Sequence, residues 1–176
     1  MSKWTIDPDH SVGAFSIRHL LIAYVHGQFN KLSGTVHYVP EDLSRTLIEL
    51  EIDVSSIITG INKRDIHLKS SDFFDTEKYP VITFKSTRAE ITGFNTCRVS
   101  GILAVHGTER PLTMEVNIAG PVKSPFGETC IGISGRAVLN REEFGLTWNK
   151  PMENGGPMVG RDVEISMDIE ADLISA

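Results

Sequence analysis

Long apolar runs, positive charge and cysteine are all scarce in this sequence. The longest unbroken apolar run extends only from Leu20 to Val25, whereas a membrane-spanning helix needs about 20 apolar residues. The first residues contain no apolar stretch followed by a cleavage site, so we expect a cytoplasmic protein. Lys and Arg number 17 against 23 Asp and Glu, which gives a net charge of −6. This acidic balance predicts no electrostatic binding surface for nucleic acid or for an anionic membrane.

Motifs for catalysis and metal binding are also missing. The two cysteines, Cys97 and Cys130, form no motif, and we expect both to be buried, reduced thiols. None of the six histidines forms a close ligand pair with carboxylate support, which argues against a metal site. No nucleophile elbow, phosphate loop or dinucleotide fingerprint occurs. The sequence therefore offers no catalytic residue, and we expect no cofactor.

Alternation of apolar and polar residues with a period of two dominates the chain. From Thr46 to Val54, every second position is Thr or a branched aliphatic residue, and the positions between them are mostly acidic. This pattern is typical of a β-strand with one buried and one exposed face. Similar segments predict eight or nine strands, over residues 4–6, 12–18, 27–39, 46–54, 81–90, 96–106, 112–118, 129–139 and 163–170.

Turn-forming residues separate these strands, and helix signals are few. The sequence Asp7-Pro8-Asp9 is one typical turn. A helix is predicted from Asn62 to Ser70, with Asn62 as its N-cap and Asp65 at the third helical position. One further capped turn is predicted over residues 140–145.

Many strands with one apolar face each, and few helices, indicate a single all-β domain over residues 1–176. The strand pattern by itself fits a sandwich or a barrel equally well. A barrel has the advantage that it leaves no unpaired edge strand exposed to other chains.

Several short motifs follow one another in order along the chain. They are Trp4-x-Ile6-Asp7-x-x-His10-Ser11, Gly27-x-Phe29, Arg64-Asp65-x-His67-Leu68, Asp72-Phe73-Phe74, Tyr79-Pro80-x-Ile82-x-Phe84-x-Ser86, His106-Gly107-Thr108 and Asn140-Arg141-x-x-Phe144-Gly145. With these motifs the chain resembles the YceI-like, polyisoprenoid-binding family from Trp4 to about Glu170. The resemblance implies a lipocalin-like barrel of eight antiparallel strands with one short helix and a long isoprenoid chain inside. It also makes a homodimer a candidate assembly.

The interior of such a barrel has two possible states, because eight strands can enclose either packed side chains or one ligand. The residues alone favour a filled barrel, whereas the resemblance favours a cavity. Apolar walls suit a ligand without directional polar groups, since each buried CH₂ contributes about 0.8 kcal/mol. The residues predicted to line the cavity or its mouth are Phe15, Ile17, Ile82, Phe84, Leu103, Met114, Val116, Ile133, Trp148, Met152, Ile165 and Met167.

Three charged residues are candidates for contact with a ligand head group. Arg64 and Asp65 lie on the predicted helix, and Arg141 follows a predicted strand. A guanidinium at the barrel rim can pair with a pyrophosphate or polarise a quinone carbonyl. The other interpretation is a structural ion pair or cap that joins the helix to the barrel. For Arg64 and Asp65 we favour the structural role.

Three functions remain open on the sequence. The first is non-enzymatic binding, carriage or sequestration of an isoprenoid amphiphile, either a prenyl pyrophosphate or a prenylated quinone. The second is an enzyme or redox partner that acts on the head group of such a lipid. The third is a filled barrel that works only through its surface. An enzyme should place two or more titratable groups beside the head group, and this predicted interior looks too apolar for that.

Overall fold

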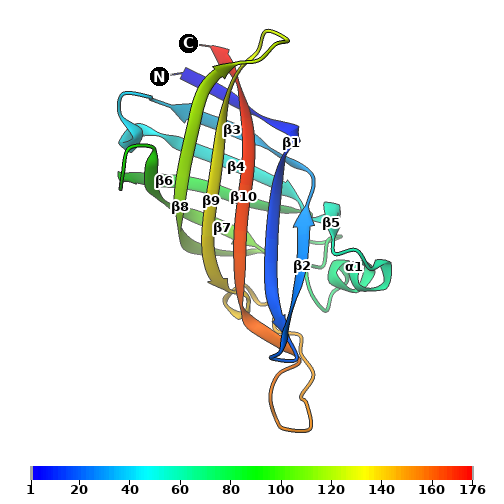
Figure 1. The fold of residues 1–176 in the computed structure, drawn as a ribbon. Coiled ribbons are helices and arrows are strands. Elements are labelled where there is room, and N and C mark those ends of the chain that lie inside the picture. Colours follow the sequence, from blue (N-terminus) through cyan, green and yellow to red (C-terminus); the bar gives the residue numbers. More distant parts are fainter. Residues whose placement is uncertain (1, 176) are drawn as a thin grey trace.

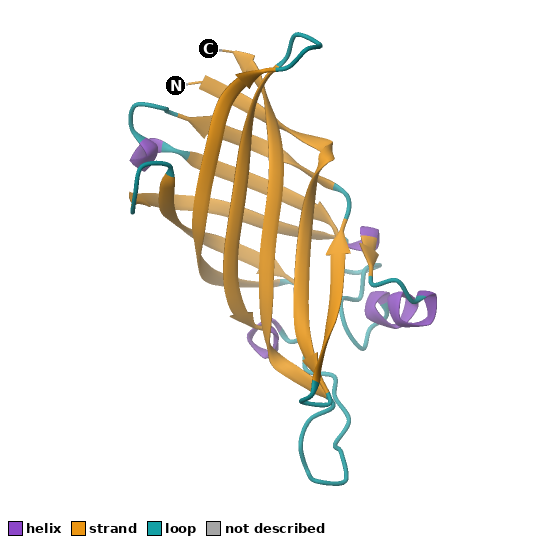
Figure 2. Cartoon of the chain, in the orientation of Figure 1, coloured by secondary structure: helices purple, strands orange, loops and turns teal. Residues whose placement is uncertain are grey.

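A computed structural model describes residues 2–175 and consists mainly of antiparallel strands (Figure 1). The elements are β1 (Ser2–His19), β2 (Ala23–Phe29), β3 (Leu32–Tyr38), β4 (Leu47–Asp53), β5 (Ile57–Ile58), α1 (Asn62–Lys69), β6 (Val81–Ile91), β7 (Thr96–Val105), β8 (Thr108–Lys123), β9 (Thr129–Asn140) and β10 (Val159–Ser175). Short 3₁₀ turns occupy Leu43–Arg45, Val54–Ser56 and Arg141–Phe144. Figure 2 shows that the strands form the wall and that the helical segments lie in the connections.

Eight of the strands close into a barrel. They pair in the order β1-β3-β4-β6-β7-β8-β9-β10, and β10 pairs again with β1. The first residues of β1 pair with β3, its second half from Gly13 to His19 pairs with β2, and β10 runs along both parts. β2 and β5 extend the sheet beyond these eight strands, and Val25 and Phe29 of β2 also line the interior. The predicted eight-stranded antiparallel barrel with one short helix is therefore confirmed, and its closure leaves an unpaired edge only at β2 and β5 among the described strands.

The period-two alternation decides which side chains point into the barrel. On β4, Ile48, Leu50 and Ile52 are all at most 7% exposed, and the acidic residues between them face outward. On β6, Ile82 and Phe84 are buried in the same way, as their alternation with polar residues predicts. Apolar burial on one face of each strand is the main stabilising contribution to this fold.

The strands differ from the prediction in several places: β8 and β10 extend beyond the predicted 112–118 and 163–170 at both ends, and β5 was not predicted. Asp7-Pro8-Asp9 does not separate two strands but forms a bulge inside β1, where the register against β10 shifts between Asp7 and Val12. Residues 27–39 form two strands rather than one, because the chain leaves the sheet at Asn30 and Lys31. The Ser56 hydroxyl accepts hydrogen bonds from both of these backbone N–H groups, at 3.1 and 3.2 Å. Because Ser56 is 25 residues away from Lys31 along the chain, the local sequence pattern could not predict this break between the two strands.

Helix α1 also begins differently from the prediction. Its N-cap residue is Ile61, which makes no side-chain cap, and Asn62 is the first helical residue. The Asp65 carboxylate instead accepts hydrogen bonds from the backbone N–H and the hydroxyl of Thr59, at 2.9 and 2.5 Å. No helix within residues 2–175 has the length and apolar character that crossing a bilayer requires.

The two cysteines are free and buried, as the sequence predicts, and they lie on the separate strands β7 and β9. Burial raises the pKa of the Cys97 thiol. A hydrogen bond to Asp172, together with burial, raises the pKa of Cys130 to about 12. Both groups are therefore protonated thiols at neutral pH, which makes them poor nucleophiles.

Candidate functional site

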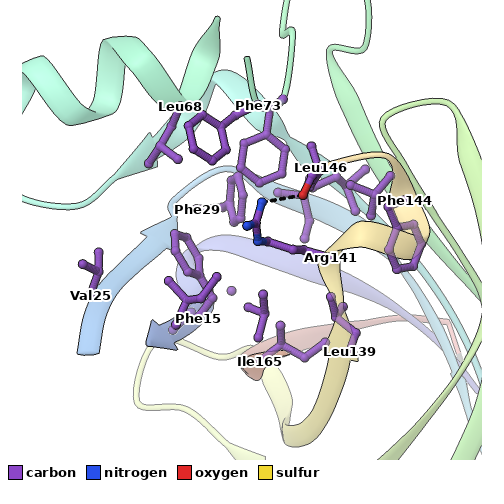
Figure 3. Close-up of a pocket in the computed structure, with 18 of the residues that line it drawn as sticks. Phe15, Val25, Phe29, Leu68, Phe73, Leu139, Arg141, Phe144, Leu146 and Ile165 are labelled. Atoms are coloured by element: carbon purple, nitrogen blue, oxygen red, sulfur yellow. Dashed lines mark hydrogen bonds between the residues drawn. The ribbon is translucent and has the colours of Figure 1, made fainter. Parts of the chain in front are cut away.

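The barrel is filled at one end and hollow at the other. Near the chain termini, Trp4, Ile118, Ile131 and Ala171 pack together and are at most 3% exposed. Around the opposite ends of β1, β9 and β10, the wall surrounds a cavity of about 290 Å³ (Figure 3). The sequence left two possibilities for the interior, a filled barrel or a barrel with a cavity. The structure combines them, because one end has a packed core and the other end has an internal cavity.

The structure brings most of the predicted lining residues together around this cavity. Those that line it are Phe15, Ile17, Ile82, Phe84, Leu103, Met114, Trp148, Ile165 and Met167, together with Arg64 and Arg141. Four predicted positions do not line it. Val116 and Ile133 face inward but belong to the packed end of the barrel, Met152 lies in the loop outside, and Asp65 turns toward Thr59. The contact of any of these residues with a ligand stays a prediction.

An aromatic lid, formed by Leu68, Phe73 and Phe74, covers part of the cavity and was not predicted. These residues come from α1 and the segment after it, and all three line the cavity. Phe74 packs edge-on against Phe29, with ring centroids 5.7 Å apart. Figure 3 shows Leu68 and Phe73 on one side of the cavity, facing Ile165 across it. The only hint in the sequence was the pair of aromatic residues Phe73 and Phe74 shortly after the predicted helix. They lie outside the predicted strands, so the alternation that identified the other lining residues does not apply to them.

Arg141 is a buried cation in the cavity wall. The residue is only 3% exposed, and its Nε donates to the Gly160 carbonyl at 2.7 Å. Nη1 donates to the carbonyls of Leu146 and Trp148, and Nη2 to that of Val159. Burial lowers the pKa of this guanidinium, but an arginine of this kind stays charged. In Figure 3 its guanidinium points toward Leu146 and Phe73. All four acceptors are neutral, and no carboxylate of the described residues is within salt-bridge distance of the guanidinium, although the adjacent Glu142 partly offsets the effect of burial on its pKa.

Among the described residues, the charged members of the cavity wall are arginines, and none is acidic. Within residues 2–175 the wall contains no Asp or Glu, although the whole chain carries a net charge of −6. Its polar members are Arg18, His19, Arg64, His67, Arg141 and Ser166. An apolar cavity with cationic groups and no acid favours a ligand whose polar end is anionic or a strong hydrogen-bond acceptor.

His67 lies in an aromatic cluster at the edge of this cavity. Its ring packs edge-on against Trp148 and Phe73, with centroids 4.8 and 5.0 Å away. Its Nε2 lies 2.8 Å from a carboxylate oxygen of Asp72, which fixes the orientation of the ring. The histidine was considered in the sequence only as a metal ligand, and its partner Asp72 belongs to the next motif along the chain.

Arg64 joins α1 to the preceding segment. Its Nε donates to the Thr59 hydroxyl at 2.7 Å, and Nη2 donates to the Thr59 carbonyl at 2.8 Å. Asp65 accepts two further hydrogen bonds from the same threonine. These contacts support the structural role favoured for the pair, even though Arg64 also lines the cavity.

Two groups of potential metal-ligating residues share Glu170, one partly exposed and one that includes the buried Cys130. The first is Asp7, His10 and Glu170, and the second is Cys130, Glu170 and Asp172, with ligand atoms within 4.8 Å in each group. Their members come from β1, β9 and β10, so spacing in the sequence could not reveal them. Asp7 already binds His10 at 2.6 Å, and the protonated Cys130 thiol is a poor ligand. We therefore interpret both groups as hydrogen-bonded pairs, and the expected lack of a metal stays a prediction.

The Asp7–His10 pair makes folding stability depend on pH. The side-chain hydrogen bond between them raises the pKa of His10 from 6.5 and lowers that of Asp7 from 3.8. A raised histidine pKa gives stability that is complete below the unfolded value and disappears as the pH rises through the folded value. A lowered aspartate pKa gives stability that disappears as the pH falls through that lowered value.

We expect His10→Gln to remove this dependence. At pH values between the lowered pKa of Asp7 and the raised pKa of His10, the wild type should be more stable than the variant. At pH values below or above this range, the difference in stability should disappear. Urea unfolding over a pH series measures it, with His26→Gln on β2 as the control. A constant difference from pH 4 to 9 would show that the pair does not act through its charge.

A closed antiparallel barrel with an apolar internal cavity is the architecture of lipocalin-like binding proteins. The YceI-like domain family matches residues 4–171 of the chain. A UPF0312 protein of Staphylococcus aureus is 34% identical over 174 residues, which cover 98% of this chain and 99% of that relative. The chain therefore belongs to the YceI-like family.

Solved structures share the fold. Burkholderia cenocepacia BcnA has a TM-score of 0.82 at 22% identity and covers 94% of this chain and 98% of its own. The Campylobacter jejuni YCEI protein has a TM-score of 0.75 at 25% identity, with 88% of each chain covered. A domain from Saccharophagus degradans, described as polyisoprenoid-binding, has a TM-score of 0.74 at 16% identity, with 98% and 99% covered.

Proposed function

We propose that this protein binds a long isoprenoid amphiphile in the barrel cavity, without catalysing a reaction on it. The apolar chain lies between the lid and the strands, and the head group faces Arg141. One observation carries this proposal: the polar residues of the cavity wall are three arginines, two histidines and one serine, with no Asp or Glu among the described residues, in a protein of net charge −6. The Saccharophagus domain shares the fold, and its described ligand is of the class proposed here.

The cavity volume bears on the length of the bound chain. At about 290 Å³ it lies near the lower end of the range for ligand sites, about 300–1,000 Å³. A longer chain must displace side chains that line the cavity. Met114, Met158 and Met167 are among them, and methionine adapts readily because it is unbranched and flexible. These residues give the same cavity the means to hold chains of different lengths.

The buried charge of Arg141 favours a prenyl pyrophosphate over a prenylated quinone. A buried guanidinium without a carboxylate partner gains most from an anionic group, because charge-assisted hydrogen bonds are about twice as strong as neutral ones. The quinone carbonyl is a neutral acceptor, like the four backbone carbonyls that Arg141 already binds.

The His67–Asp72 pair is the one observation that favours catalysis on the head group. A histidine oriented by a carboxylate is a common general base. A carrier role fits better, because the described cavity wall offers no carboxylate or thiol to act as the partner acid or nucleophile. Incubation with geranylgeranyl pyrophosphate separates the two: a carrier returns it unchanged, and release of phosphate or pyrophosphate would establish the enzyme.

Organic extraction and mass spectrometry of the protein purified from its own host test the proposed function directly. We expect an isoprenoid with a pyrophosphate or a related acidic head group. The melting temperature should fall on delipidation and recover on addition of geranylgeranyl pyrophosphate, since a ligand bound only to the native state stabilises it by mass action. Recovery of no lipid, together with no stabilisation by any prenyl compound, would contradict the proposal.

Arg64→Ala tests whether the helix arginine is structural. Loss of its two hydrogen bonds to Thr59 should cost about 1–2 kcal/mol, which lowers the melting temperature by roughly 2–8 °C in a domain of this size. Binding of geranylgeranyl pyrophosphate and of geranylgeraniol should weaken alike. Lys63→Ala, an exposed position on the same helix, is the control. Selective loss of pyrophosphate binding at unchanged stability would instead place Arg64 at the head group.

A further inference from the structure

The turn between β1 and β2 exposes three consecutive apolar residues. Leu20, Leu21 and Ile22 are 38%, 51% and 79% exposed. The turn lies at the end of the barrel opposite the chain termini, next to the loop before β10 (Figure 1). Leu20 and Leu21 are partly covered, and Leu21 lies beside Gly156 of the loop before β10, but burial inside the protein does not explain the mostly exposed Ile22 or the exposed parts of the two leucines.

The backbone of this turn is strained. Leu20 and Leu21 have φ values of 53° and 63°, in the left-handed region that favours Gly, Asn or Asp. A polar turn residue would relieve this strain and would also be better hydrated. Strain that persists at an exposed position points to a role in binding rather than in stability.

The turn is attached to the mouth of the cavity. The Leu20 backbone N–H donates to the Met158 carbonyl at 2.7 Å. Met158 itself lines the cavity, as do the exposed Arg18 and the half-buried His19 directly before the turn, so the cavity reaches the surface here. Any surface that the turn contacts therefore lies close to the opening through which a ligand enters.

The hairpin segment itself carries no acidic residue, whereas the neighbouring β9–β10 loop and the start of β10 contribute both signs, with Lys150 and Arg161 as well as Glu153 and Asp162. No Asp or Glu occurs from His10 to Pro40, although the chain has 23 of them. The Arg18 guanidinium lies over the ring of Tyr24, 4.4 Å from its centre, and Tyr24 is 44% exposed. Arginine and tyrosine beside an apolar tip are typical of segments that sit at a membrane surface. The net charge of the whole chain predicted no binding surface for an anionic membrane, but the segment from His10 to Pro40 contains no acidic residue and differs from the chain as a whole.

We propose that the Leu20–Ile22 turn inserts into the surface of a phospholipid bilayer that contains anionic lipid, and so brings the cavity mouth against the membrane. A second copy of the chain is a poorer partner, because three residues on a convex tip cannot supply the roughly 800 Å² per partner of a stable protein interface. The proposed function supplies only the purpose of docking, which is to exchange an isoprenoid chain between the membrane and the cavity without exposing it to water. Docking itself does not require an occupied cavity.

Flotation with vesicles of phosphatidylcholine, alone or mixed with phosphatidylglycerol, tests the docking. The delipidated wild type should bind both, and the mixed vesicles more tightly. Leu21→Asn combined with Ile22→Ser should weaken binding at least about tenfold, since two apolar side chains no longer enter the bilayer. Its melting temperature should be equal or higher, because Asn tolerates the left-handed backbone. Weaker binding therefore cannot be explained by unfolding.

The matched control is Phe94→Ser combined with Phe126→Ser. These two side chains are 96% and 90% exposed, more than any residue of the Leu20–Ile22 turn, and lie in the β6–β7 and β8–β9 turns. The control should bind vesicles like the wild type. Equal loss in both double variants would show nonspecific adsorption and overturn the proposal. Self-association that depends on the turn, without vesicle binding, would also overturn it in favour of a second copy.

Ligand binding is measured separately, with geranylgeranyl pyrophosphate delivered from detergent. The turn variant should bind it with wild-type affinity but acquire it from vesicles at least about tenfold more slowly. If lipid is found in the cavity but vesicle binding does not depend on the turn, the docking proposal is refuted and the proposed function stands. Turn-dependent vesicle binding without any cavity ligand would refute the proposed function and leave the docking intact.

Discussion

Met114→Trp is expected to abolish lipid binding while the apo barrel remains about as stable as wild type. Met114 lies on β8 and lines the cavity, so the larger side chain occupies space that a ligand would use. Displacing three or more methylene groups of the ligand, at about 0.8 kcal/mol each, should weaken binding at least about fiftyfold. Isothermal titration with geranylgeranyl pyrophosphate and urea unfolding of the apo protein measure the two effects.

Val116→Trp is the matched control. Val116 lies two residues along the same strand and faces the same interior, but it belongs to the packed end and is 5% exposed. Added volume there has no cavity to enter, and overpacking a core costs about 1–3 kcal/mol or more. Equal destabilisation by the two substitutions would mean that the cavity closes in solution and that the barrel is filled throughout.

Arg141→Met is expected to cause the largest loss of stability in this set. It removes the Arg141 hydrogen bonds to the carbonyls of Leu146, Trp148 and Gly160, which tie the loop between β9 and β10 to the cavity wall. The Val159 carbonyl, its fourth acceptor, keeps a donor in Asn149 Nδ2 at 2.7 Å. Each buried carbonyl left without a donor costs about 1–3 kcal/mol. Removal of an uncompensated buried charge offsets part of this, so we expect a net loss of about 3 kcal/mol in urea unfolding.

Arg141→Lys separates the charge from the hydrogen bonds. Lysine keeps the positive charge but cannot reproduce the planar fork of donors, so its stability should fall between wild type and Arg141→Met. Below the melting temperature of each variant, the lysine protein should still prefer geranylgeranyl pyrophosphate over geranylgeraniol, and the methionine protein should lose that preference. A preference that survives in Arg141→Met would move the head group to Arg64 or His67.

The strands and their inward-facing positions could be predicted because strand alternation is a local property, whereas the barrel was implied by the family resemblance, since the alternation fits a sandwich equally well. Burial on one face of β4 and β6 follows from side chains that alternate across a strand, whatever the strands pair with. The same pattern cannot give the height of a residue along the barrel axis. Met114 and Val116 look equivalent in the sequence, yet one lines the cavity and the other belongs to the packed end.

For the polar part of the site, the sequence could indicate candidate residues but not the groups that they contact. Arg141 was a candidate from its motif, but its role depends on four carbonyls that the loop before β10 brings back to it. The His67–Trp148 contact likewise joins residues far apart in the chain. Pairs of this kind have no local signature, since only closure of the barrel places them within hydrogen-bond or ring-contact distance.

The sequence by itself determined the class of fold, the face of each strand that is buried, and a largely apolar interior, because these follow from periodicity and composition. Tertiary structure alone decided that the barrel is packed at one end and hollow at the other. It also decided that the cavity wall carries cations without acids, and that an apolar turn stands beside its mouth. The physical reason is that volume and electrostatic balance depend on every residue around a space, and the chain gathers those residues only when it closes.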